Sequence, residues 1–406
     1  MTRIKGEKVH HAVGLVIQLV FLLASTYAED GEVSMIFGGD VDFSRLTRYL
    51  HHKRNCSYEN PLKGLETSFE TADFSLINLE TTVGRPKNEM LKRGATITAL
   101  WSEPEAIPPL KKVGVTHVGL ANNHVQDFTE PGLNRTIDRV KSAGIGFTGI
   151  VKGVSGYLPQ EPLILEKNGL KIGVLSYCHV KGCRENWQNM TIGPALMRND
   201  LTNVISDVKS LRKEVDVVVL FLHWQIEYSG VNNFQAVAIV KKLTQSVRID
   251  LITGSHPHVT QKHWYVGNTL VVPSLGNLFF SPFNYANIWF NAGLKKKASS
   301  LERISKIWYK QMMVMRDGTS EGRILRVTFN KKGVVRSRTE YINTRITATS
   351  QHCMVTEVDG NSRWREVCGK DDDECTGTST CNYVMCDDDE PTPNDLSTEP
   401  PAKIDN

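Results

Sequence analysis

The sequence feature that most constrains the fold is an apolar stretch that ends in two histidines, DLITGSHPH at residues 250–258. Its apolar start predicts a buried strand, and its Gly-Ser pair predicts the turn that follows. Pro257 fixes its own φ and favours an extended backbone at His256, and side chains at i and i+2 of an extended segment face one side. We therefore expect His256 and His258 to project together from a strand end. There they either lie at the surface or provide imidazole ligands for a transition metal.

Strand and helix patterns alternate through most of residues 33–278, which predicts βαβ units and a largely parallel sheet. In such sheets, ligands bind beyond the carboxyl ends of the strands. Five predicted strands end in side chains with oxygen or nitrogen donors: Asp40 with Asp42, Glu80, Asn123 with His124, His223, and His256 with His258. This repetition favours a metal site over unrelated polar loops. Asp127 follows closely enough to orient His124 from behind.

The first 28 residues have the composition of a secretory signal peptide. A basic start is followed by an apolar run at 12–24, too short for a comfortable membrane span, and by the small-residue pattern TYA at 26–28. We expect a signal peptide at 1–28 and a secreted protein, with an uncleaved membrane anchor as the alternative. No later stretch is apolar enough to cross a bilayer. Three Asn-x-Ser/Thr triplets would be glycosylation acceptors in a eukaryotic secretory pathway: Asn55, Asn134 and Asn189.

The eight cysteines are even in number and contain no C-x-x-C pair, which favours disulfides over a zinc ribbon. Cys178 and Cys183 are close enough in sequence to pair. Five cysteines lie in an acidic segment that we expect to form a Cys-rich extension at 346–390, after a folded domain at 29–345. The remaining residues, 391–406, are rich in Pro, Thr and Asp and are predicted to be disordered.

The formal net charge of +4 conceals an uneven distribution. From Asp371 onward the chain carries eleven acidic residues and one lysine, so the part before it is basic. A basic body favours an anionic substrate, although it could serve solubility alone. We expect a small-molecule or polymer anion as the substrate and no nucleic acid.

Together these residues resemble the CapA family of capsule or poly-γ-glutamate synthesis proteins, within the calcineurin-like metallophosphoesterase superfamily. The resemblance covers about residues 33–280. It depends on a spaced set of motifs: GGDVDF at 38–43, NLE at 78–80, ANNH at 121–124, HW at 223–224, GSHPHV at 254–259 and SLGN at 274–277.

The resemblance implies a layered α/β fold, a β-sandwich flanked by helices that holds two divalent metal ions, with Mn, Zn and Fe as candidates. It implies a shared set of metal ligands: Asp40, Asp42, Glu80, Asn123, His223, His256 and His258. His124, with Asp127 behind it, corresponds to the histidine that faces the substrate. Two positions depart from the superfamily pattern. Asp42 stands where a histidine is usual, and Glu80 is the nearest counterpart of the bridging aspartate.

The function implied by the resemblance is hydrolysis at a dinuclear site, in which two ions about 3.5–4 Å apart activate water and stabilise an oxyanion. Phosphate esters are the substrates of the superfamily, whereas the CapA relatives indicate γ-linked glutamate polymers. A binding or export role for an anionic polymer, without turnover, uses the same fold and is the alternative.

Overall fold

The computed structural model describes residues 31–84, 99–184, 190–230, 234–280, 320–350, 353–360 and 362–369, together with Asp372 and Cys375. The expected signal peptide at 1–28 and the expected tail at 391–406 lie outside these residues, as do Cys381 and Cys386. No helix within the described ranges is long and apolar enough to cross a membrane.

Two β-sheets form the centre of the described fold. The larger sheet has the order β19-β18-β16-β1-β2-β5-β6, with β15 paired to β1. The smaller sheet has the order β13-β14-β12-β11-β9-β8. The strands of the larger sheet are β1 (Val33–Asp42), β2 (Phe74–Leu79), β5 (His117–Gly119), β6 (Gly146–Thr148), β15 (Asn277–Phe280), β16 (Glu321–Asn330), β17 (Gly333–Val334), β18 (Glu340–Ala348), β19 (Met354–Val358) and β20 (Arg365–Glu366). Those of the smaller sheet are β8 (Leu163–Lys167), β9 (Leu170–Cys178), β11 (Val217–His223), β12 (Leu251–Ser255), β13 (Trp264–Val266) and β14 (Thr269–Val272). Two short pairs complete the strands: β3 (Thr82–Val83) with β4 (Trp101–Ser102), and β7 (Ile150–Lys152) with β10 (Ile192–Pro194).

The apolar faces of the two sheets pack against each other and form an inner core. Phe37 of β1 and Phe221 of β11 meet there with ring centroids 6.5 Å apart, and Leu325 of β16 belongs to the same buried cluster. Buried residues on both faces of a strand explain the nearly continuous apolar runs in the sequence, such as Val217–Leu222.

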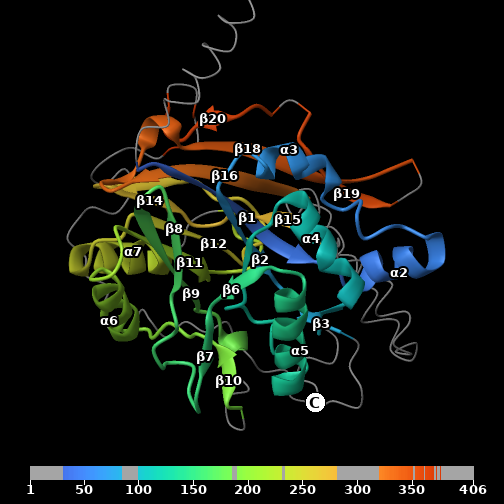
Figure 1. Ribbon diagram of the computed structural model, residues 1–406, viewed down its shortest axis with the longest axis horizontal. Helices are drawn as coiled ribbons and strands as arrows, with labels where there is room; N and C mark the ends of the chain where they lie inside the picture. The colour runs from blue at the N-terminus through green and yellow to red at the C-terminus, as the bar shows by residue number, and fades with distance from the viewer. Residues whose placement is uncertain are drawn as a thin grey trace, which may run out of the picture.

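Helices cover the outer faces, so the expected layered α/β sandwich is confirmed (Figure 1). The helices are α2 (Arg45–Arg54), α3 (Glu66–Phe69), α4 (Pro108–Val113), α5 (Thr129–Ser142), α6 (Thr202–Leu211) and α7 (Phe234–Ser246), and the short 3-10 turns are η1 (Lys63–Leu65), η2 (Pro104–Ala106), η3 (Lys181–Cys183) and η5 (Arg336–Arg338). In Figure 1, α6 and α7 lie beside β11 and β9, and α4 and α5 lie on the opposite side. A Cβ at Gly173 of β9 would lie 2.7 Å from Leu211 of α6, so glycine permits this close helix–sheet packing.

Local sequence signals predicted several elements correctly. The hairpin at Asn168-Gly169 forms between β8 and β9, with positive φ angles of 53° and 70° as its type of turn requires. Gly114 ends α4 with φ 101°. Ser102 is a residue type that often caps helices, but it caps neither η2 nor α4. Ser102 lies in β4, and its hydroxyl instead accepts a hydrogen bond from the Phe43 amide at 3.1 Å.

The region after residue 320 is more closely joined to the sandwich than its composition suggests. Residues 333–342 form β17, η5 and the start of β18 instead of one continuous strand. β18 continues through residue 345, where we expected the domain to end, and β19 pairs antiparallel with it. A disulfide between Cys56 and Cys353 ties this region to the end of α2. The expected Cys178–Cys183 disulfide is present, and Cys368 pairs with Cys375.

Candidate metal centre

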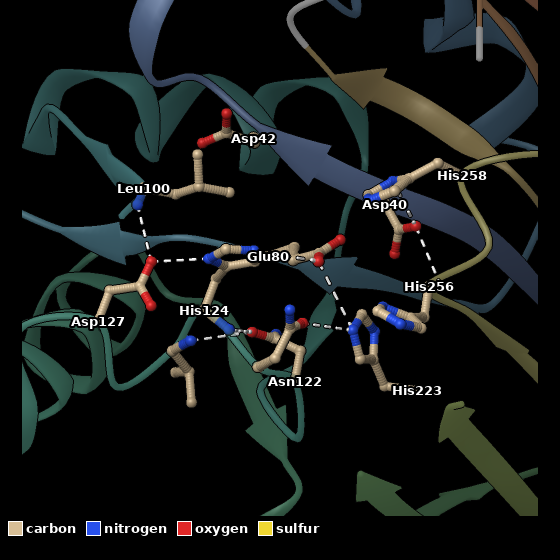
Figure 2. A network of polar contacts seen from close by, with 12 residues as sticks. Asp40, Asp42, Glu80, Leu100, Asn122, His124, Asp127, His223, His256 and His258 are labelled. Atoms are coloured by element: carbon tan, nitrogen blue, oxygen red, sulfur yellow. Dashed lines mark hydrogen bonds and ion pairs between the residues drawn. The ribbon is translucent and has the colours of Figure 1, made fainter. Parts of the chain in front are cut away.

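The carboxyl ends of strands from both sheets converge on one cluster of buried polar residues (Figure 2). From the larger sheet come Asp40, within β1, and Glu80, directly after β2. From the smaller sheet come His223, at the end of β11, and the two histidines that follow β12. Each of these side chains is no more than 6% exposed. The convergence of strand ends that the sequence predicted is therefore present, and it joins two sheets.

A local irregularity in β1 places Asp40 in the cluster. The register between β1 and β2 shifts between Gly38 and Asp40, as in a β-bulge. A Cβ at Gly39 would lie 1.9 Å from the carbonyl oxygen of Gly276, so only glycine fits here. The Asp40 amide donates to the same carbonyl oxygen at 3.0 Å. The GGD motif thus turns the strand so that the carboxylate faces the second sheet.

Glu80 is a fully buried carboxylate whose two oxygens have no hydrogen-bond partner among the described residues. The closest basic groups are ring nitrogens, Nε2 of His223 at 3.5 Å and Nε2 of His124 at 4.0 Å. Burial and the nearby charge of Asp40 raise the pKa of Glu80 well above its ordinary value. A buried charged group is costly unless it is paired or binds a metal, so ionised Glu80 requires a cation beside these oxygens.

Two groups of potential metal ligands share Glu80. One contains Glu80, His223 and His256, and the other contains Asp40, Glu80 and His258; within each group the donor atoms lie within 4.8 Å of one another. His256 Nδ1 is buried and has no hydrogen-bond partner among the described residues. Burial keeps the pKa of His256 well below its ordinary value, so its ring is neutral. Neutral imidazoles and carboxylates suit Zn, Fe or Mn. The donors therefore fit divalent cations, and Glu80 belongs to both groups.

Asp40 is held by donors on several sides. Its Oδ1 accepts from Nδ2 of Asn78 at 2.7 Å, its Oδ2 accepts from the His256 amide at 3.2 Å, and Nδ1 of His258 lies 3.3 Å from the same Oδ2. Burial alone would raise the pKa of Asp40, but the hydrogen bond and charge of His258 hold it well below its usual range. Burial would likewise lower the pKa of His258, and Asp40 raises it. Asn277 Oδ1 lies 2.9 Å from His258 Nδ1 and orients the ring from behind.

His124 lies at the edge of the cluster, and its side chain is 15% exposed. Its Nδ1 is 2.7 Å from Oδ2 of Asp127, as the sequence predicted. The same Asp127 oxygen accepts a hydrogen bond from the Leu100 amide at 2.7 Å, so the carboxylate is fixed before it orients the imidazole. His124 Nε2 is left facing the cluster (Figure 2). A proton on that nitrogen can be exchanged with a molecule bound there.

The two asparagines of the ANNH motif have different environments. Asn123 Oδ1 lies 2.7 Å from Nε2 of His223, beside one of the ligand groups. Asn122 is fully buried. It donates to the Leu79 carbonyl and Asn78 Oδ1, and its own Oδ1 accepts from the His124 and Val125 amides. Asn122 thus holds the His124 loop against β2.

Three of these supporting residues were not among the predicted site residues: Asn78, Asn122 and Asn277. Each belongs to one of the quoted motifs, NLE, ANNH or SLGN, and that membership was the available signal.

Asp42 lies away from the ligand groups (Figure 2). Its carboxylate accepts hydrogen bonds from the amide of Ser44 at 3.0 Å and from its hydroxyl at 2.6 Å. Burial raises the pKa of Asp42, and the Ser44 hydrogen bonds oppose that rise. Side chains at i and i+2 share a face only while the strand is regular, and the pairing of β1 with β15 shifts register between Asp40 and Val41. Its role as a metal ligand stays a prediction.

The backbone at the paired histidines differs from the extended conformation that we expected. His256 has φ 102° and His258 has φ 57°, and the chain bends directly after β12. The His256 amide bonds to Asp40, and the Pro257 carbonyl accepts from the Tyr228 amide at 2.7 Å; these contacts hold the bend. Such conformations cost about 1–3 kcal/mol per residue and occur at functional sites. The imidazoles still face one cluster, with ring centroids 6.2 Å apart.

Two of the three expected glycosylation positions can be located. Asn55 caps the end of α2 and is exposed, and Asn134 is exposed on α5. Asn189 lies outside the described residues. Exposure leaves both described asparagines accessible for modification.

Fold and site together define a two-sheet α/β sandwich with a candidate metal centre at the strand ends. The chain belongs to the family described as bacterial capsule synthesis protein PGA_cap, whose sequence profile matches residues 34–282. The expected relationship to CapA is thereby confirmed.

Two curated relatives have the same kind of name. The PGA biosynthesis protein CapA of Bacillus subtilis (strain 168) is 24% identical over 295 residues, which cover 69% of this chain and 75% of that protein. The capsule biosynthesis protein CapA of Bacillus anthracis is 24% identical over 290 residues, which cover 66% and 68%.

Solved structures similar to this chain include enzymes with far lower sequence identity. The NAD nucleotidase of Haemophilus influenzae has a TM-score of 0.43 at 11% identity and covers 85% of this chain and 57% of its own. The calcineurin-like phosphoesterase YfkN of Bacillus subtilis has a TM-score of 0.40 at 12% identity and covers 82% and 90%.

Proposed function

We propose that this capsule-synthesis family member is a metal-dependent hydrolase that acts on phosphoester or γ-glutamyl polymer substrates. The observation that carries the proposal is the buried Glu80 carboxylate, which is shared by two groups of potential metal ligands and accepts no hydrogen bond from the part of the chain that the structure describes. The oriented His124–Asp127 pair stands beside it, so residues that would bind cations adjoin a residue that could move a proton.

One ion would be held by Asp40, Glu80 and His258, and the other by Glu80, His223 and His256, with Asn123 beside the second. When bound, such ions supply positive charge that lowers the pKa of water and stabilises an oxyanion.

Residues of the chain itself would transfer the proton. Asp127 holds Nδ1 of His124, which leaves Nε2 to hold or donate a proton at the leaving oxygen or nitrogen of the substrate.

The names of the curated relatives favour γ-glutamyl polymers among the possible substrates, because those proteins are named for PGA or capsule biosynthesis. The same names support a second function, in which the site binds or exports an anionic polymer without cleaving it. A metal centre would then bind the carboxylates of the polymer. Both functions predict bound metal, and only the hydrolase predicts cleavage of the polymer.

The test is an activity screen of the full chain with added Mn²⁺, Zn²⁺ or Fe²⁺ against phosphoesters and poly-γ-glutamate. Hydrolysis that requires metal and is abolished in His256→Ala supports the enzyme. A metal-loaded protein that binds poly-γ-glutamate and cleaves none of these substrates supports the binding function instead. Glu105→Gln, an exposed change outside the cluster, serves as the control for nonspecific effects.

Export is part of the same proposal. The N-terminal composition and the disulfides in the described residues support passage through an oxidising compartment. Mass spectrometry of the protein recovered from the medium should find an N-terminus near Glu29 and no alkylatable thiols. A retained residue 1 would support the membrane anchor, and free thiols in the native protein would contradict oxidative folding.

A further inference from the structure

A second cluster of metal-ligand side chains lies between the last turn of α2 and the segment that precedes η2. It consists of His51, His52 and Glu103, whose donor atoms lie within 4.8 Å of one another. Its residues are separate from the central ligand groups and are more accessible. The side chain of His52 is 57% exposed and that of Glu103 is 18% exposed.

Each donor in this cluster is oriented by a neighbour. Nδ1 of His51 lies 2.8 Å from the carbonyl oxygen of Cys56, which accepts its proton and leaves the Nε2 lone pair available. The His51 ring also stacks on Tyr58 with centroids 4.3 Å apart. The Tyr58 hydroxyl donates to Oε2 of Glu103 at 2.8 Å, and Oε1 of the same carboxylate faces Nε2 of His52 at 2.6 Å.

The surroundings fix the charge and position of these groups. Burial would raise the pKa of Glu103, but the hydrogen bonds from His52 and Tyr58 hold it below the ordinary value, so the carboxylate is ionised. The Cys56–Cys353 disulfide fixes the residue whose carbonyl orients His51. Neither the stacking of His51 on Tyr58 nor its contact with the Cys56 carbonyl involves a residue of the central site. The proposed hydrolysis therefore does not explain why these three side chains are held together.

Two imidazoles and one carboxylate are the protein ligands of many open zinc sites. Zinc bonds to nitrogen and oxygen of about 2.0–2.2 Å place tetrahedral ligands roughly 3.3–3.5 Å apart. The observed separations lie within 4.8 Å, so small rotations of the exposed His52 side chain would close the site.

We propose that His51, His52 and Glu103 form a zinc site that fastens the end of α2 to the segment before η2. The bound ion would replace the ion pair between His52 and Glu103 and draw His51 into the same contact. Ser102, the residue before Glu103, bonds through its hydroxyl to the Phe43 amide and to Thr81, which follow Asp42 and Glu80. Zinc would therefore stiffen the chain segments that lead out of the central site, without contributing to its ligands.

The experiment measures zinc bound to the full-length protein after equilibrium dialysis against zinc, by elemental analysis. Wild type should bind one more equivalent than Glu103→Gln, and Glu105→Gln, the same change two residues along, should bind as wild type does. His256→Ala should lose central metal and still show the one-equivalent difference when combined with Glu103→Gln. The double variant therefore tests the His51–His52–Glu103 site whether or not the central site binds metal.

A second readout guards against a variant that does not fold. Zinc should raise the melting temperature of wild type by more than that of His52→Gln, a change at an exposed ring, while both proteins melt alike without metal. Equal zinc content in wild type, Glu103→Gln and Glu105→Gln would overturn the proposal and leave a surface ion pair. Equal zinc-dependent shifts in wild type and His52→Gln would also overturn it.

Discussion

Among the buried carboxylates that lie close to histidine, Asp372 and Glu80 have opposite surroundings. Asp372 lies beside the Cys368–Cys375 disulfide, and its fully buried side chain receives three donors. They are Nε2 of His263 at 2.6 Å, the Tyr341 hydroxyl at 2.9 Å and the Cys368 amide at 2.7 Å. Glu80 is equally buried and receives no hydrogen bond from the described residues.

The pKa values follow these surroundings. Burial would raise the pKa of Asp372, but the hydrogen bond and charge of His263 hold it well below its ordinary value. Burial raises the pKa of Glu80 well above its ordinary value, and the charge of Asp40 adds to the rise. Hydrogen-bond donors from the protein stabilise the ionised form of a buried carboxylate. A buried carboxylate without such donors is stabilised in its ionised form only by a cation. The contrast separates a structural cluster from the candidate metal centre within one chain.

The largest effect is expected for Glu80→Gln. Because this carboxylate belongs to both ligand groups, the change should weaken binding of both ions by more than about 100-fold, beyond the usual effect of losing an outer partner. The metal-free protein should melt at the same temperature as wild type or higher, since an unpaired buried acid is removed. Metal titration followed by calorimetry checks both statements. Unchanged metal affinity would place the cations elsewhere.

His124→Ala should separate metal binding from turnover. The ring lies 4.0 Å from Glu80 and belongs to neither ligand group, so most of the metal should stay bound. Any hydrolysis should slow by roughly 10²–10⁴-fold, because a positioned acid is lost. Rates and metal content measured on one preparation test this prediction. Parallel loss of metal and rate would make His124 a ligand rather than a proton donor.

Asp372→Asn should lower the free energy of unfolding by about 2 kcal/mol, the scale of a charge-assisted buried hydrogen bond. The loss should be the same with and without metal, because Asp372 serves His263 and the cysteine loop. Urea unfolding of both forms gives the comparison. A loss confined to the metal-loaded protein would mean that the two carboxylates are coupled.

The loss of unfolding free energy in Asp372→Asn should depend on pH in a defined direction. A carboxyl whose pKa is depressed in the folded state adds stability that is present above its unfolded pKa of about 4 and disappears as pH falls through the folded value. Wild type and Asp372→Asn should therefore differ most at neutral pH and converge below about pH 4. Unfolding curves between neutral and acidic pH measure the convergence. A difference that grows on acidification would show that Asp372 is protonated in the folded protein.

The smallest effect is expected for removal of residues 391–406. Their composition predicts disorder, so truncation at 390 should change neither the melting temperature nor the metal content. Truncation at about 350 is the informative contrast, because it removes Cys353, the partner of Cys56, together with β19. We expect reduced yield and a free thiol in that variant. Unfolding on loss of residues 391–406 would contradict the disorder.

The sequence predicted what local patterns control. Apolar runs located the strands, the Asn-Gly turn located a hairpin, and polar residues after strands located most of the candidate centre. Long-range pairing was not predictable in the same way. The contact of Cys56 with Cys353 spans 297 residues, and neither neighbourhood carries a signal for the other.

Details of the candidate centre also escaped prediction for physical reasons. Alternation along a strand placed Asp42 beside Asp40, but the pairing of β1 with β15 shifts register between Asp40 and Val41, which interrupts that alternation. Proline predicted an extended His256, whereas contacts to Asp40 and Tyr228 hold it at positive φ. In both cases contacts from distant segments outweigh local preference.

The most direct test of the central claim is elemental analysis of the full-length protein purified from medium supplemented with Mn, Zn and Fe. Wild type and Asp372→Asn should carry the same amount of metal, and Glu80→Gln should carry two equivalents less. That result would establish Glu80 as a metal ligand and Asp372 as a carboxylate that protein hydrogen bonds stabilise. Equal metal in wild type and Glu80→Gln, or none in wild type, would contradict it.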